Sequence, residues 1–404
     1  MHRRLDGVRA EVEGVSKGKE QSQGGRARRA TALLMMAALA TVLGWWMWPV
    51  GSFEVLEPAP AGILSMTPLA DGRVVCAGKD ANDRSALWVY SPKRKRWTMV
   101  ARPPRGIGIG HSATALGLGR VLFIGGVGSG RSVLIYMANL DRYLEMTSPP
   151  LPRNSHTAVR LWDGRVLVAG GLHAEREETT ALGSLEIFDP DANAWIPAGV
   201  MKERRVNHTA SLLPDGRVLI VGGVYPGQGM LSSTEIFDPV AWKVTPGPDT
   251  GQVREAHHAH ELDDGRVLIF AGTQSTGWAQ PPLDTAQIFD PEKEAWIDAA
   301  PMKRGRRDSA SVKLPDGRIM AIGGWWRPWR RGLWYYFWRV RELVLNRPSD
   351  GFLTSTEIYD PKRDRWNDGP NLNPPQDNSP SAVYLPEEGV LTVGFDGLVQ
   401  RWVP

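Results

Sequence analysis

Residues 208–242 read HTASLLPDGRVLIVGGVYPGQGMLSSTEIFDPVAW and contain one complete repeating unit. A short strand (HTASLL) and an apolar strand (RVLIV) flank Asp215 and Gly216. Asp-Gly between two strands favours a tight hairpin, because glycine accepts positive φ at no steric cost. A third strand (STEIF) follows a glycine pair and a loop, and a fourth begins at Trp242. This unit predicts a four-stranded antiparallel meander.

The same turn recurs along the chain. Successive turn glycines are 45–52 residues apart, except for a last interval of 72. They are Gly72, Gly119, Gly164, Gly216, Gly265, Gly317 and Gly389. A fixed period of this length is typical of repeat architectures, and radial repetition of four-stranded sheets protects their edges. We therefore predict an all-β fold, a seven-bladed β-propeller over residues 52–404.

Paired glycines and a later aromatic pair mark most units. The aromatic pairs are Phe188 with Trp195, Phe237 with Trp242, Phe289 with Trp296, Tyr359 with Trp366, Tyr90 with Trp97, and Tyr136 with Tyr143. In these features residues 52–404 resemble the kelch-repeat family, which implies an innermost first strand. We expect the aromatic residues to be core. Ala77 and Ala271 depart from the pattern by replacing the first glycine of a pair, and the last unit has only Gly394.

The last unit ends early, since LVQRWVP closes the chain after a third strand. Residues 53–58, FEVLEP, align with the fourth strands of other units and lead into a proline-containing link. We expect them to complete the blade formed by residues 381–403. Joining both ends of the chain in one blade would close the ring and remove its free edge.

The N-terminus carries a membrane signal. A basic tail (1–29) precedes residues 30–50, ATALLMMAALATVLGWWMWPV, which contain no charge. About twenty helical residues span the ~30 Å hydrocarbon core. Arginines before it and tryptophans at its end predict a retained transmembrane helix, with the tail cytoplasmic and the propeller outside, in a bacterial envelope. The alternative is a cleaved signal peptide with its site near residues 59–61.

Charge and cysteine content restrict the function. The net charge is +4, and the tail alone supplies it with eight Lys or Arg against four Asp or Glu. The balanced body leaves no basic stripe for nucleic acid. A single cysteine, Cys76, excludes intramolecular disulfides and cysteine-based metal clusters. No nucleophile elbow, phosphate loop or zinc motif is present, and among His257, His258 and His260 only the last two share a strand face. We expect no cofactor, no metal and no enzyme activity.

Strand parity separates two faces of the propeller. The turn face has the connections between strands one and two and between strands three and four, whereas the loop face has the others. On the loop face an Arg-x-x-His pattern enters successive first strands. Its members are Arg153, His156, Arg205, His208, Arg254, His257 and Arg306, with Ser309 last and His111 in the same register earlier. We call these residues the collar. The collar could bind a carboxylate-bearing ligand such as an acidic sugar, because Arg offers fixed, forked donors. Alternatively, each Arg and His could tie its own blade loop to the next.

The sixth unit carries an aromatic and Arg-rich insertion at residues 325–352 on the loop face, where residues 333–345 could form a short helix. Trp, Tyr and Arg are enriched in interface hot spots and in membrane-surface helices. The predicted contact residues are Trp325, Trp326, Trp329, Arg330, Trp334, Tyr335, Phe337 and Trp338. These residues could contact a protein partner or lipid, or they could simply pack over the channel. We expect a membrane-anchored binding or scaffold subunit in a membrane complex, with a carbohydrate-binding or carbohydrate-modifying protein as the alternative.

Overall fold

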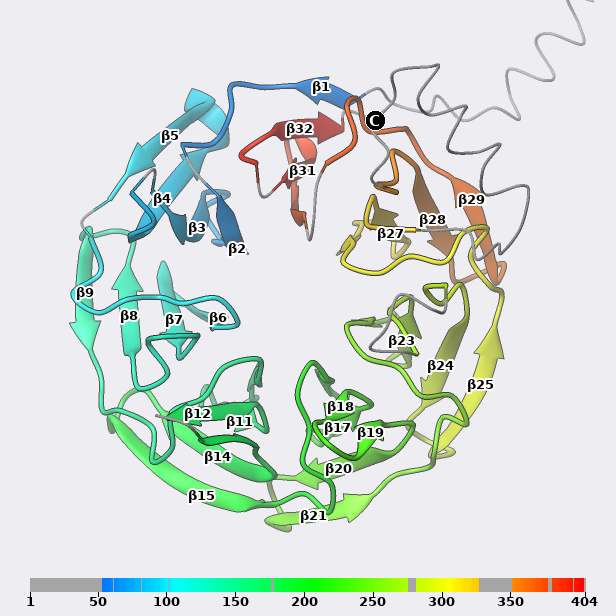
Figure 1. Ribbon diagram of the computed structural model, residues 1–404. Coiled ribbons are helices and arrows are strands. Elements are labelled where there is room, and N and C mark those ends of the chain that lie inside the picture. Colours follow the sequence, from blue (N-terminus) through cyan, green and yellow to red (C-terminus); the bar gives the residue numbers. More distant parts are fainter. Residues whose placement is uncertain are drawn as a thin grey trace, which may run out of the picture. The chain divides into compact units, whose positions relative to one another are not determined.

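The fold is a ring of seven four-stranded antiparallel sheets (Figure 1). The computed structural model describes residues 53–402 except 61, 81, 101, 176–177, 275–280, 327–350, 377–379 and 395. Two further two-stranded sheets are hairpins within connections. The predicted seven-bladed propeller is therefore confirmed.

Six blades are each a meander of four strands that follow one another along the chain, and the seventh takes its fourth strand from the N-terminal side. The first blade contains β2 (Ile63–Pro68), β3 (Val74–Lys79), β4 (Ser85–Ser91) and β5 (Arg96–Met99). The second contains β6 (Ser112–Gly117), β7 (Arg120–Ile124), β8 (Val133–Met137) and β9 (Arg142–Glu145). The third contains β10 (Thr157–Arg160), β11 (Val166–Ala169), β14 (Ser184–Asp189) and β15 (Ala194–Val200). The fourth blade contains β16 (Thr209–Leu212), β17 (Val218–Val221), β20 (Thr234–Asp238) and β21 (Lys243–Pro246). The fifth contains β22 (His258–Glu261), β23 (Val267–Phe270), β24 (Ala286–Asp290) and β25 (Ala295–Ala299). The sixth contains β26 (Ala310–Lys313), β27 (Ile319–Ile322), β28 (Thr356–Asp360) and β29 (Arg365–Asp368). The seventh contains β30 (Ser381–Leu385), β31 (Gly389–Val393), β32 (Val399–Trp402) and β1 (Phe53–Val55). A 3-10 turn, η1 (Pro92–Arg94), joins β4 to β5.

The Asp-Gly-Arg turns close themselves. Gly216 adopts a φ of +89°, which L side chains rarely adopt. The Arg217 backbone N–H donates to Asp215 Oδ1 at 3.0 Å, and Arg217 Nε donates to Asp215 Oδ2 at 2.7 Å. The same pair of bonds recurs in four other blades, at Arg73, Arg165, Arg266 and Arg318. The local sequence thus fixes the hairpin without help from neighbouring blades.

The N-terminal strand closes the ring, as predicted. β1 pairs antiparallel with β32, with Phe53 opposite Trp402 and Val55 opposite Gln400 (Figure 1). Arg401 reinforces the join, because its guanidinium bonds Glu54 at 2.5 Å and Glu388 at 3.0 Å. The outermost strand of this blade therefore comes from the opposite end of the chain to its other three.

The hydrophobic core lies between adjacent blades. One cluster joins Leu167 and Ile187 of the third blade with Val218 and Phe237 of the fourth, all nearly inaccessible to solvent. Burial of such side chains contributes about 1.5–3 kcal/mol each, so each blade is stabilised by its neighbours.

The aromatic prediction is only half right. The Phe or Tyr of each pair is buried, but Trp242 is 40 % exposed, and several of its counterparts are half-buried. The reason is position, because the Trp lies on the outermost strand or, for Trp242, directly before it, where one side of the ring faces solvent. Its indole Nε1 instead donates across the blade boundary, as from Trp195 to the Thr147 carbonyl at 2.8 Å and from Trp296 to that of Pro248 at 3.0 Å. The Trp therefore joins blades as well as packing.

The predicted transmembrane helix at residues 30–50 and the tail at 1–29 lie outside the described residues. Within the part of the chain that the structure describes, no helix has the length and apolar character needed to cross a membrane.

Candidate functional site on the loop face

The loop face contains every long connection of the described chain. Two extra hairpins stand on it, β12 (Leu172–Glu175) with β13 (Glu178–Ala181), and β18 (Val224–Tyr225) with β19 (Gly229–Met230). Both lie between a second and a third strand. The insertion of the sixth blade leaves from the equivalent position, after β27. A rigid ring thus presents loops of unequal length on one side.

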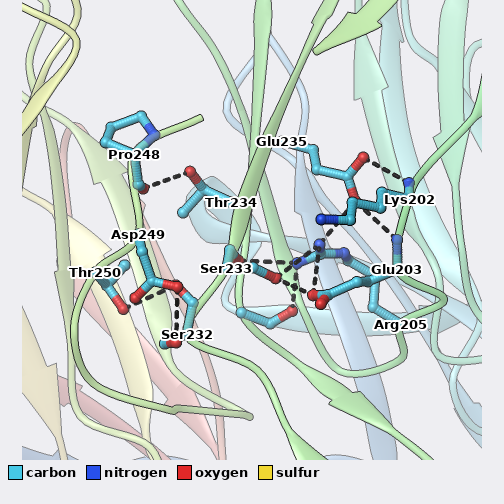
Figure 2. A network of polar contacts seen from close by, with 11 residues as sticks. Lys202, Glu203, Arg205, Ser232, Ser233, Thr234, Glu235, Pro248, Asp249 and Thr250 are labelled. Carbon is cyan, nitrogen blue, oxygen red and sulfur yellow. Dashed lines mark hydrogen bonds and ion pairs between the residues drawn. The ribbon is translucent and has the colours of Figure 1, made fainter. Parts of the chain in front are cut away.

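The collar arginines lie beneath these loops and are buried. Arg205 and Arg306 expose no surface, and Arg153 exposes 1 %. In the fourth blade Arg205 Nη1 donates to the Gly222 carbonyl at 2.9 Å, and Nη2 donates to Glu235 Oε1 at 2.9 Å (Figure 2). Each of these arginines therefore ties the link before the first strand to the second and third strands of its own blade.

The carboxylate of this ion pair has further partners. Glu235 accepts the backbone N–H groups of Lys202 at 2.8 Å and Glu203 at 3.2 Å (Figure 2). In the sixth blade Glu357 accepts the corresponding amides of Lys303 and Arg304 and pairs with Arg306 at 2.5 Å. The buried charge is compensated and every carboxylate oxygen is hydrogen-bonded, which is the condition for tolerating a buried ion pair. Arg153 pairs with Glu186 in the third blade.

The collar histidines form a second layer that connects neighbouring blades. A hydrogen bond of 2.8 Å joins His156 Nε2 to Ser112 Oγ of the preceding blade, and one of 3.0 Å joins His208 Nε2 to Thr157 Oγ1. His257 bonds Thr209 in the same way, and His111 bonds Ser65. At the next boundary the roles reverse, because Ser309 stands at the histidine position and bonds His258 of the blade before it.

Burial keeps these imidazoles neutral. It lowers the pKa of His208 and of His258 to about 3 and that of His260 to about 4. It also lowers the pKa of His156 and His257 well below the ordinary value of histidine. Desolvation disfavours the charged ring, and the nearby arginines add repulsion. The histidines therefore add no positive charge to the collar at neutral pH.

These contacts favour one of the two interpretations of the collar. A ligand in the channel could reach Arg205 or Arg306 only by displacing a buried, capped carboxylate. The side chains do tie strands and blades together, as the structural interpretation requires. Binding of an acidic sugar by the whole collar stays a prediction, and the burial of Arg153, Arg205 and Arg306 does not favour it. Among the described residues, no group of three or more His, Cys, Asp or Glu side chains is arranged to hold a metal ion.

The turns before the collar histidines meet around the channel. Ser155, Asn207 and Ala256 all adopt φ values near +50°. The Asn207 N–H donates to the Ser155 carbonyl at 3.3 Å, and the Ala256 N–H donates to that of Asn207 at 3.1 Å. Backbone bonds therefore pass from blade to blade at the channel mouth. This belt gives the loop face a stiff base.

A pocket of about 770 Å³ opens on the loop face between the second and third blades. The glycine-rich connection at residues 126–130 lines one side, and Leu172 and Thr179 of the β12–β13 hairpin line the other. Close backbone contact explains the glycines, since a Cβ at Gly126 would lie 2.4 Å from the Gly108 carbonyl oxygen. Arg105 stands at the rim with a half-exposed side chain that bonds Glu145 at 2.8 Å.

The base of the insertion is well anchored. Trp325 forms isolated bridges with both Arg307 and Phe352, and the Arg307 guanidinium lies 4.4 Å from the centre of a Trp325 ring. Trp326 N donates to the Gly351 carbonyl at 2.9 Å. The other predicted contact residues, namely Trp329, Arg330, Trp334, Tyr335, Phe337 and Trp338, lie outside the described residues, as does the possible helix at 333–345.

Sequence reasoning missed the acidic half of the collar. Glu186, Glu235 and Glu357 follow their arginines by 33, 30 and 51 residues, so no fixed spacing reveals the pairs. The available signal was the Glu within the third-strand pattern, as in STEIF, where alternation places it on an inward face. A charged residue at such a position needs a buried partner.

Residues 256–303 match the family model described as Kelch motif. Kelch-like protein 23 of Pongo abelii is 26% identical over 289 residues, which are 70% of this chain and 45% of that protein. tRNA wybutosine-synthesizing protein 4 of Saccharomyces cerevisiae is 33% identical over 98 residues, or 24% of this chain and 13% of that one. The chain thus matches less than half the length of these curated relatives.

A solved structure titled as a novel fungal alcohol oxidase in complex with copper has a TM-score of 0.69 with 14% identity, covering 88% of this chain and 76% of that one. This likeness shows the fold alone. The fold and its loop face define a closed seven-bladed β-propeller. The motif match and the kelch-like relative support its assignment to the kelch-repeat family.

Proposed function

We propose that this chain is a non-enzymatic, protein-binding propeller that contacts its partner through the loop face. The observation that carries the proposal is the asymmetry of the two faces. The β12–β13 and β18–β19 hairpins and the insertion all connect second to third strands, whereas the turn face has short, self-closing turns. Long loops on a rigid scaffold are where binding usually resides. The kelch-like relative is consistent with an interaction module.

The proposal includes a membrane context. The uncharged stretch at residues 30–50 would anchor the propeller outside the cytoplasm of a bacterial envelope, as a scaffold subunit of a membrane complex. Because β1 begins at Phe53, such an anchor would be nearly continuous with the strand that closes the ring. Tether and propeller would then be mechanically coupled.

The insertion provides the test. Trp326 and Gly351 are joined by a backbone hydrogen bond of 2.9 Å, so a two-residue link can replace residues 327–350 without straining the blade. We expect the shortened protein to keep its melting temperature but to recover much less partner from detergent-solubilised native membranes. The matched control is Trp162→Ser, because Trp162 is exposed on the turn face and its loss should leave partner recovery unchanged.

Two results would contradict the proposal. One is recovery of the same partners, in the same yield, by the shortened and parent proteins. The other is recovery of the parent protein alone from membranes that contain it in its natural setting.

A further inference from the structure

The fifth blade breaks the pattern of the buried arginines. Arg254 occupies the collar position and exposes no surface, like Arg205 and Arg306. At the place of Glu235 and Glu357, however, the fifth blade has Gln287. In the described part of the chain, no carboxylate lies within ion-pair distance of Arg254.

Arg254 makes only contacts with neutral groups. Nη2 donates to Gln252 Oε1 at 2.8 Å, to Thr285 Oγ1 at 3.1 Å and to Gln287 Oε1 at 3.4 Å. Nη1 donates to the Ala271 carbonyl at 3.3 Å, longer than the 2.9 Å of the equivalent bonds in the fourth and sixth blades. Burial, with no opposing carboxylate, lowers the pKa of Arg254 to about 10. A buried cation in this state is poorly compensated.

The backbone around the missing carboxylate differs as well. In the fourth and sixth blades two amides of the preceding link bond the glutamate. In the fifth blade the relation is inverted, because Gln287 Nε2 donates to the Thr250 carbonyl at 2.9 Å. Figure 2 shows this link, with Asp249 and Thr250, beside the intact network of the fourth blade.

A pocket of about 420 Å³ opens at this place on the loop face. Gln252, Thr285 and Gln287 line it, and these are the side chains that accept from Arg254 Nη2. Arg254 is therefore one layer behind the pocket wall. Asp298 also lines the pocket, is exposed, and accepts from Gln287 Nε2 at 3.2 Å.

We propose that this pocket binds a carboxylate from outside the blade, which displaces the Gln252 side chain and pairs with Arg254. The incoming group binds where the Gln252 amide oxygen now lies, 2.8 Å from Arg254 Nη2, and supplies the negative charge that Glu235 and Glu357 supply in the fourth and sixth blades. The present acceptors of the Arg254 guanidinium are neutral, so exchanging the Gln252 amide oxygen for a carboxylate oxygen adds the opposite charge that the buried cation lacks. The Thr285 hydroxyl, which now donates to Gln252 Oε1 at 2.6 Å, can donate to the incoming carboxylate instead. The carboxylate belongs either to a free organic acid or to an acidic side chain of a protein.

Small probes test the site in the full-length chain. Glutarate and glucuronate represent free acids, and the peptide acetyl-Gly-Glu-Gly-amide represents an acidic side chain. We expect at least one to raise the melting temperature in a saturable manner, compared with sodium chloride at equal ionic strength. Binding of an acid alone or of the peptide alone identifies the source, and both results support the site. If none of the three binds, the proposal is wrong.

Two substitutions locate the binding. Gln287→Glu restores the carboxylate of the other blades, and Gln252→Glu supplies one from the link. Each should raise the melting temperature without ligand and weaken probe binding roughly ten- to hundredfold, because the cation is then already paired. Because two Glu variants are tested, the experiment still gives an answer if one of them does not fold. Asp298→Asn, at an exposed position, should strengthen probe binding by removing a like charge. Undiminished binding in a folded Glu variant would overturn the proposal.

Discussion

The buried histidines predict that the propeller is unstable in mild acid. In the unfolded chain each imidazole has a pKa near 6.5, whereas burial lowers the folded value to about 3 for His208 and His258 and about 4 for His260. Between these limits the unfolded state binds more protons than the folded state. The free energy of unfolding therefore falls as pH decreases through 6.5, and is fully retained only above it.

The magnitude follows from the pH interval. Lowering the pH from 7.5 to 5 reduces the stability by about 2 kcal/mol for each such histidine, because the slope rises to about 1.4 kcal/mol per pH unit below pH 6.5. His208, His258 and His260 together lose about 6 kcal/mol, and His156 and His257 add to this. Glu255, whose pKa burial raises, acts in the opposite direction. The loss is comparable with the total stability of many domains, roughly 5–15 kcal/mol.

Urea unfolding at pH 7.5, 6.5, 5.5 and 5.0 measures the effect, and calorimetry in buffers of different ionisation enthalpy counts the protons taken up. His260→Gln removes one titrating group and can still hydrogen-bond Ser311, which His260 contacts at 2.7 Å. Its stability at pH 7.5 is the reference for any structural cost, and its loss down to pH 5 should be about 2 kcal/mol smaller. A parent protein equally stable at pH 6.5 and 5.0 would refute the reasoning.

Three further predictions concern contacts that hold strands and blades together. Glu357→Gln should lower the free energy of unfolding by about 3–5 kcal/mol in urea, since Arg306 stays buried without its charge partner; a change under about 1 kcal/mol would contradict this. Removing residues 1–58 deletes β1 together with the apolar contacts of Phe53 and Leu56, so we expect the free energy of unfolding to fall by about 3 kcal/mol. An unchanged melting temperature would argue against closure by β1. Trp195→Phe keeps the aromatic contact with Phe188 but removes the bond to Thr147, at a cost of about 1 kcal/mol measured by denaturant unfolding; an unaltered midpoint would mean that water replaces the bond.

The sequence was sufficient for the features that depend on local rules. The Asp-Gly-Arg turns are self-closing, so their spacing predicts the blade count, and the early end of the last unit predicts its completion by Phe53–Val55. The collar positions were also recognised. Their chemistry was not, because it depends on burial and on partners such as Glu186 and Glu235 that no fixed spacing connects to Arg153 and Arg205. The membrane helix and most of the insertion stay predictions, since they fall on residues outside the described part.

The buried ion pairs explain how one face of a rigid ring can vary in loop length. Arg205 and Arg306 each bond the carbonyl of the residue 17 positions later, the first glycine of the pair. Their glutamates follow by 30 and 51 residues, because the sixth blade carries the insertion. The geometry of the two pairs is nevertheless the same. The pair therefore fixes the ends of the second-to-third connection, so that segments added between those ends need not disturb the blade. Where Gln287 replaces the glutamate, Arg254 keeps only neutral partners, and the carboxylate that we propose to bind beside it would connect the scaffold of this face with ligand binding.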